Sequence, residues 1–165
     1  MVVEKYNPKW VEQFRVLKEF LEKNTTEYIS IEHVGSTSIP GMNAKPIIDI
    51  DIVVEDASQF QRLKEELSKI GYVHEGDRGI PGREAFDHEN VPLNIDHHLY
   101  VCVKDNAELQ RHLKFRDKLR SSPELVNEYN KIKEEILAKV GADNRAGYVQ
   151  MKETDYKWFF DKVLS

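Results

Sequence analysis

Apolar residues follow two different spacings along this chain. Residues 8–23 carry large apolar side chains every three or four positions, the spacing of one face of an amphipathic helix. Residues 28–34 instead alternate apolar and polar side chains, which is typical of a strand with one buried face. Residues 47–54 are dominated by isoleucine and valine, so they predict a strand in the middle of a sheet.

Polar residues and glycines mark where the predicted helices begin and end. Two helix starts show a polar cap followed three positions later by Glu or Gln, the spacing of a capping box: Asp56 with Gln59, and Asp105 with Glu108. Gly71 ends the first of these helices, and the second extends to about residue 120. Ser122, followed by a proline, starts a helix that ends near Gly141, and a last helix covers residues 144–164.

The order of the elements separates a mixed part of the chain from a helical part. Short strands are predicted over residues 72–75, 83–88 and 93–103, the last two as a hairpin. We therefore predict an α+β fold, in which a mixed β-sheet core flanked by helices covers residues 1–103. A C-terminal helical extension over residues 104–165 is expected to pack on this core, giving a single compact unit.

Composition narrows the class of protein. Of the 165 residues, 40% are apolar, which suffices for a core, and the net charge of −5 argues against coating nucleic acid or an anionic membrane. The longest apolar run, residues 46–54, is interrupted by two aspartates and is too short to span a membrane. The single cysteine, Cys102, lies in an apolar run and excludes an internal disulfide. We expect a cytoplasmic protein that does not enter membranes and whose overall charge disfavours nucleic acid as a partner, with a local basic patch as the alternative; the oligomeric state stays open.

The strand at residues 47–54 contains the most informative pair of side chains. Asp49 and Asp51 stand two positions apart, so both point to the same face of the strand. Two carboxylates in apolar surroundings repel each other and lose hydration, and a hard divalent cation such as Mg²⁺ removes that cost. An edge strand whose acidic face lies in water is the alternative.

A glycine and a serine follow the preceding strand. Gly35 lets backbone N–H groups approach a phosphate, and the hydroxyl of Ser36 adds a donor. The spacing matches neither a Walker P-loop nor a dinucleotide-binding fingerprint. A Gly-Ser pair by itself is also a common turn, but its place one strand before Asp49 and Asp51 favours a phosphate site.

These two motifs together resemble the active-site signature of the polymerase-β-type nucleotidyltransferases, a strand and a Gly-Ser turn followed by a strand with two alternating aspartates. The chain resembles the GrpB family of this superfamily more closely and over almost its whole length. The matching stretches are residues 6–10, 31–41 (IEHVGSTSIPG), 45–50 (KPIIDI), 71–72, 79–83, 97–99, 112–117 (HLKFRD) and 119–120.

This resemblance implies a fold and a set of site residues. Gly35 and Ser36 would hold the triphosphate, and Asp49 and Asp51 would bind Mg²⁺ or Mn²⁺. The superfamily usually adds a third carboxylate from a later strand. Asp96 is our candidate for that third catalytic residue, with Glu84 as the other carboxylate available.

The match to the family is incomplete near the third carboxylate. Where the family has the motif His-His-Leu-His, the last position in this chain is Tyr100, and Asp96 lies outside the motif. Because His97 and His98 are adjacent on a strand, they point to opposite faces, and we expect His98 to line the cleft and to bind the nucleotide or its phosphates.

Further polar residues are expected to contact the phosphates. His33 would orient a phosphate or a metal-bound water, although it could equally cap the end of its strand. Lys45, Arg83 and Arg116 would neutralise phosphate charge, the alternative for each being a solvated surface position. Arg116 shares a helix face with His112, four residues earlier.

Three hypotheses about function follow. The first is a metal-dependent nucleotidyltransferase that moves a nucleotidyl group from a nucleoside triphosphate to an unknown acceptor. The alternative is a non-catalytic module of the same fold that binds a nucleotide or a coenzyme A-related phosphate compound, since relatives in the family are fused to dephospho-coenzyme A kinase. The third is a structural domain, which predicts no cleft between the sheet and the C-terminal helices.

Overall fold

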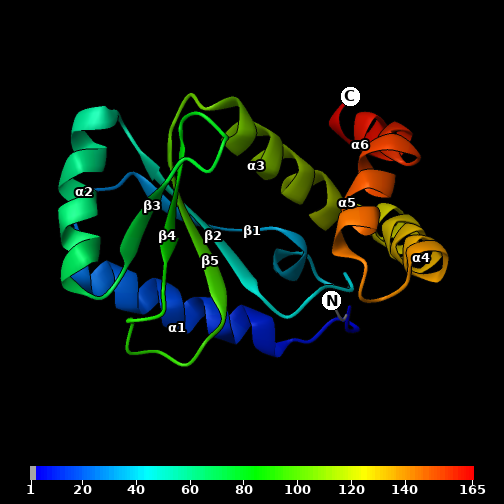
Figure 1. The fold of residues 1–165 in the computed structure, drawn as a ribbon, viewed down its shortest axis with the longest axis horizontal. Helices are drawn as coiled ribbons and strands as arrows, with labels where there is room; N and C mark the ends of the chain where they lie inside the picture. The colour runs from blue at the N-terminus through cyan, green and yellow to red at the C-terminus, as the bar shows by residue number, and fades with distance from the viewer. Residues whose placement is uncertain (1–2) are drawn as a thin grey trace.

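A five-stranded mixed sheet forms the centre of the computed structural model, which describes residues 3–165, so residues 1 and 2 of the predicted core lie outside it. The strands have the spatial order β1-β2-β5-β4-β3 (Figure 1). Antiparallel pairing joins all neighbours except β2 and β5, which run parallel. The strand bounds are β1 Ser30–Val34, β2 Ile48–Val54, β3 Val73–Gly76, β4 Arg83–Asp87 and β5 His97–Val103.

One face of this sheet is buried under two helices, α1 (Lys9–Asn24) and α2 (Ala57–Lys69). The isoleucines at positions 48, 50 and 52 of β2 point into this layer, together with Leu99 and Val101 of β5. Side chains alternate along a strand, so the aspartates between the isoleucines necessarily point to the other face. The apolar spacing of the first helix and the isoleucine-rich strand are both confirmed.

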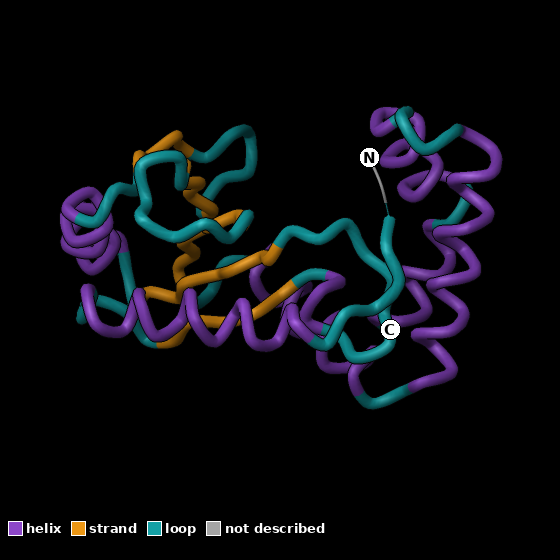
Figure 2. The backbone as a smooth tube through the Cα atoms, turned by 90° about the horizontal axis from the view of Figure 1, so that it is seen from below, coloured by secondary structure: helices purple, strands orange, loops and turns teal. Residues whose placement is uncertain are grey.

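The other face of the sheet meets the C-terminal helices. Leu109 of α3 (Ala107–Arg120) packs on Val53 and Cys102, and burial raises the pKa of the Cys102 thiol to about 12, as expected for a buried thiol. Figure 2 shows the helices that follow α3 gathered at one end of the sheet. Their bounds are α4 Pro123–Val140, α5 Arg145–Thr154 and α6 Lys157–Leu164.

A second apolar cluster holds the C-terminal helices to the loop after β1. Ile39 and Met42, which follow the short 3-10 helix η1 (Ser36–Ser38), are buried against residues of α4, α5 and α6. The Gly-Ser segment thus lies where the sheet and the helical extension meet. The α+β architecture with a mixed sheet flanked by helices is confirmed.

Most predicted helix boundaries agree with the structure. Asp56 caps α2 by accepting from the Gln59 backbone N–H at 2.8 Å, and Ser122 caps α4 by accepting from that of Leu125. The predicted cap at Asp105 is wrong: Asn106 is the N-cap of α3, and its side chain accepts from the Leu109 N–H.

The single helix predicted over residues 144–164 is also wrong. The chain turns at Asp155–Tyr156 and separates α5 from α6. This break brings Tyr148 and Phe159 into the same apolar cluster.

Strand β5 begins at His97, four residues later than predicted from position 93, because residues 93–96 form the end of the preceding loop. Within residues 3–165, no helix is long and apolar enough to cross a membrane.

Candidate functional site

An open cleft of about 940 Å³ lies between the second face of the sheet and the C-terminal helices. Its walls come from the β1–η1 turn, β2, β5 and all four helices from α3 to α6. Lysine and arginine side chains outnumber carboxylates in these walls, although the whole chain carries a net charge of −5. The purely structural hypothesis predicted no such cleft, so the geometry counts against it.

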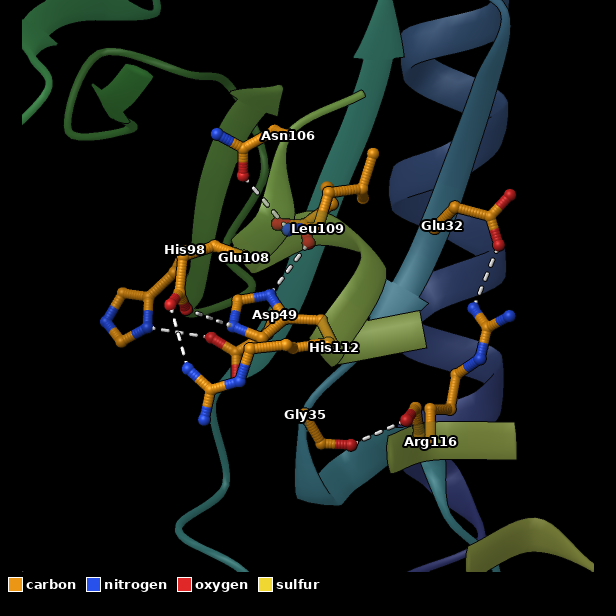
Figure 3. Close-up of polar contacts among 12 residues, drawn as sticks. Glu32, Gly35, Asp49, His98, Asn106, Glu108, Leu109, His112 and Arg116 are labelled. Carbon is orange, nitrogen blue, oxygen red and sulfur yellow. Dashed lines mark hydrogen bonds and ion pairs between the residues drawn. The ribbon is translucent and has the colours of Figure 1, made fainter. Parts of the chain in front are cut away.

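Asp49 and Asp51 stand side by side on the cleft face of β2. The parallel register places Asp49 opposite His98 and Asp51 opposite Tyr100 on β5. His98 Nδ1 lies 2.9 Å from Asp49 Oδ1 (Figure 3), and because an ionised carboxylate only accepts, the imidazole donates. His98 therefore lines the cleft, whereas His97 points to the opposite face and bonds with the Tyr72 hydroxyl.

Asp51 is fully buried, with one carboxylate oxygen engaged and one free. His112 of α3 donates from Nδ1 to Asp51 Oδ2 at 3.1 Å, and its Nε2 lies 3.7 Å from Glu108 Oε2. Asp51 Oδ1 is buried and has no hydrogen-bond partner among residues 3–165. An unsatisfied buried carboxylate oxygen costs free energy, so it favours a bound cation at this point.

Gly35 lies directly against the side chain of Asp49. A Cβ atom added to Gly35 would stand 2.4 Å from Asp49 Oδ2, and the residue has a φ of 74°. Any other side chain would collide with the carboxylate and also strain the backbone. Glycine is therefore required here by Asp49.

Ser36 contacts a lysine that the sequence patterns did not single out. Lys133 of α4 donates to the Ser36 hydroxyl at 2.8 Å and to the Asn43 carbonyl, and lies 4.5 Å from the Tyr129 ring centroid. Burial lowers the pKa of Lys133 to about 7. The signal was a charged residue on the apolar face of α4, beside Ile132 and Ile136.

His33 lies outside the cleft. His33 lies two positions after Ile31 on β1, so its side chain points to the same face of the sheet, toward α1. There its ring stacks on Phe14 and forms a hydrogen bond with the Thr37 hydroxyl at 3.0 Å. Burial lowers its pKa to about 3. The structure therefore supports the alternative that His33 stabilises the end of β1.

The three predicted cations all line the cleft but differ in their partners. Lys45 is exposed and lies three residues before the start of β2. Arg116 donates to the Glu32 carboxylate at 2.9 Å and to the His33 carbonyl, which ties α3 to β1 (Figure 3). Arg83 lies over the Tyr100 ring, 4.1 Å from its centroid.

The structure does not bring a third carboxylate from the sheet to Asp49 and Asp51. Asp96 lies just before β5, outside the regular strand whose alternation would place it on the same face as His98. Its side chain is exposed and pairs with His88 at 3.3 Å. Glu84 is opposite Val101 in the register, so it faces α2 and approaches His74.

Asp49 and Asp51 are thus the residues that fit a divalent cation. Mg²⁺ is commonly held by one or two carboxylates while water and substrate phosphates complete its coordination. Asp51 Oδ1 has no hydrogen-bond partner among residues 3–165, and Asp49 lies two positions away on the same face of β2, so these two carboxylates supply oxygen ligands of this kind. In the part of the chain that the structure describes, no three His, Cys, Asp or Glu residues form a preassembled metal site.

Comparison with known proteins places the fold and the family. The YqkA protein of Bacillus subtilis is 38% identical over 90% of this chain, which spans 43% of that protein's length. The crystal structure of conserved protein GrpB from Enterococcus faecalis has 33% identity and a TM-score of 0.79, covering 99% of this chain and 97% of that one.

A more distant likeness concerns the fold alone. A MgGTP-bound structure of the Cid1 poly(U) polymerase is 15% identical with a TM-score of 0.50, covering 82% of this chain and 46% of that one. The chain therefore has a nucleotidyltransferase-like fold. The family model described as GrpB protein matches residues 1–163, and the chain belongs to the GrpB family.

Proposed function

We propose that this protein is a metal-dependent nucleotidyltransferase that binds a nucleoside triphosphate in the cleft. The observation that carries the proposal is the pair Asp49 and Asp51 on the cleft face of β2, with Gly35 in contact with Asp49 and a free buried oxygen on Asp51. Carboxylates next to a close backbone approach are what a metal–triphosphate complex requires.

The residues around this pair have separate tasks in the proposal. Asp49 and Asp51 would hold Mg²⁺ or Mn²⁺, and the bound ion would supply positive charge to stabilise the departing pyrophosphate. His98 and His112 fix the orientation of the two carboxylates through their Nδ1 hydrogen bonds. Ser36 and the buried Lys133 donate to the phosphates on the β1 side of the cleft.

The reaction transfers the nucleotidyl group to an acceptor. The acceptor nucleophile forms a bond to the α-phosphorus while the bond between that phosphorus and the bridging oxygen to the β-phosphate breaks. Pyrophosphate leaves on the opposite side. Catalysis rests mainly on positioning and on charge stabilisation, which is what a cleft with excess basic side chains supplies.

Calorimetric titration with the common nucleoside triphosphates, with and without Mg²⁺ or Mn²⁺, tests the binding step. We expect metal-dependent binding by the wild type and at least a tenfold weaker affinity for Asp49→Asn/Asp51→Asn. Asp96→Asn is the matched control, because that carboxylate lies outside the cleft, and it should bind within twofold of wild type. Equal binding by the double variant and wild type contradicts the proposal.

A second candidate is the non-catalytic module that binds a nucleotide or a coenzyme A-related phosphate compound. It is favoured by the cleft face of β5, where His98, Tyr100 and Cys102 leave no carboxylate beside the aspartates. Release of pyrophosphate from a bound triphosphate in the presence of a metabolite extract separates the two. The enzyme releases it and the binding module does not.

A further inference from the structure

Arg83 is fixed on the cleft face of the sheet by its position in β4. The antiparallel register places it opposite Cys102, and its guanidinium carbon lies over Tyr100, 4.1 Å from the ring centroid. The turn before it is held in place by Asn106, which caps α3 and donates from Nδ2 to the Pro81 carbonyl at 3.0 Å (Asn106 is labelled in Figure 3). Arg83 is therefore a positioned cation.

The Arg83 side chain has no hydrogen-bond or ion-pair partner among residues 3–165, and its Nε is buried. Other arginines of the cleft are paired: Arg111 binds Glu108 and Arg116 binds Glu32. A half-buried guanidinium without an acceptor is costly, and its planar donors match the two oxygens of a phosphate or carboxylate. Its surroundings therefore favour an anionic ligand.

Arg83 lies on the opposite side of the aspartates from the other cationic position. In the sheet order β1-β2-β5-β4, the Ser36–Lys133 pair is at the β1 side of Asp49 and Asp51, and Arg83 is at the β4 side. In an in-line displacement the attacking and leaving groups stand on opposite sides of the α-phosphorus. If the triphosphate lies at Ser36, the acceptor enters beside Arg83.

We propose that Arg83 binds the acceptor substrate and that the acceptor's nucleophile is an oxyanion, a phosphate monoester or a carboxylate. This inference rests on the proposed nucleotidyltransferase function. The acceptor oxygen forms a bond to the α-phosphorus, the bond to the bridging oxygen breaks, and pyrophosphate leaves. The product is a phosphoanhydride or an acyl-phosphate anhydride, and no proton is transferred.

An anionic acceptor oxygen needs no deprotonation before it attacks the α-phosphorus. A hydroxyl acceptor would instead lose a proton to a base beside the metal-binding pair. His98 is placed to act as that base, because its Nδ1 donates to Asp49 and its Nε2 is then the basic nitrogen of the ring. The feature that favours an anionic acceptor is therefore Arg83, a cation without an acceptor on the side of the aspartates opposite Ser36 and Lys133.

Titration with inorganic phosphate and with acetate, followed by ¹⁵N NMR at the Arg83 Nε–H resonance, tests this inference. The protein is used free and saturated with Mg²⁺ and α,β-methylene-ATP. We expect either anion to shift the resonance in both states, and phosphate affinity to fall at least tenfold in Arg83→Gln. Arg111→Gln, which removes a cleft arginine already paired with Glu108, is the control and should stay within twofold.

Two results overturn the inference. One is equal affinity of wild type and Arg83→Gln for both anions. The other is competition between the anion and the nucleotide analogue, because Arg83 would then contact the nucleotide's own phosphates. If the analogue does not bind at all, the proposed function fails, while the titration of free protein still reports on Arg83 by itself.

Discussion

Lys133 donates a hydrogen bond to Ser36, a residue 97 positions earlier in the chain, at 2.8 Å. This contact joins α4 of the helical extension to the Gly-Ser turn of the sheet, at the edge of the cleft. The turn that a phosphate would contact is therefore positioned by both parts of the chain. The extension completes the candidate site as well as covering apolar surface.

Replacing Gly35 by alanine should abolish nucleotide binding through steric conflict with Asp49. The new Cβ would lie 2.4 Å from Asp49 Oδ2, so the carboxylate must move. Gly141→Ala is the matched control, since both glycines have a positive φ with extended ψ, but nothing lies within 4 Å of a Cβ at Gly141. We expect both variants to lose about 1–3 kcal/mol of stability. Calorimetry should show loss of metal-dependent nucleotide binding in Gly35→Ala alone.

Replacing Asp51 by asparagine should stabilise the metal-free protein by about 1 kcal/mol, because a neutral amide is less costly to bury than a carboxylate with an unpartnered oxygen. The same change should remove any thermal stabilisation by Mg²⁺, which linkage predicts for the wild type. Urea denaturation and thermal melts with and without Mg²⁺ measure both effects. A metal-free variant less stable than wild type by several kcal/mol would contradict this account.

The stability contributed by Lys133 should depend on pH. Burial lowers its pKa from the ordinary 10.5 to about 7, so between these values the unfolded chain binds more protons than the folded one. The free energy of unfolding therefore rises with pH from about 7 to about 10.5. Urea denaturation at several pH values should show this rise in wild type relative to Lys133→Met. A difference that stays constant with pH would show that the ammonium group is not desolvated.

Replacing Asn106 by alanine should cost about 1 kcal/mol, because its side chain caps α3 and also holds the Pro81 carbonyl. Asp105→Ala changes the neighbouring residue that the capping-box spacing indicated, and should cost less than about 0.5 kcal/mol. Urea denaturation of the two variants measures the difference. Equal losses would show that the cap is shared between them.

Local patterns in the sequence determined much of the fold. The alternation along residues 47–54 predicted that Asp49 and Asp51 share a face opposite the isoleucines, because strand geometry fixes this whatever surrounds the strand. The helix caps at Asp56 and Ser122 could also be predicted from the sequence, because a cap depends only on residues within one helical turn. For the same geometric reason, the adjacent side chains of His97 and His98 had to point to opposite faces of the sheet.

Tertiary structure decided which polar residues meet the aspartates. The sheet register places His98 beside Asp49 and leaves Asp96 outside the cleft, and no local pattern encodes the register of strands 49 positions apart. His112 and Lys133 reach the site because α3 and α4 pack across the sheet and its first loop. A sequence reveals such distant partners only as charged or polar residues on otherwise apolar faces, since pairing depends on how separate elements pack. The sequence by itself thus determined the carboxylate pair, and the fold supplied the residues that surround it.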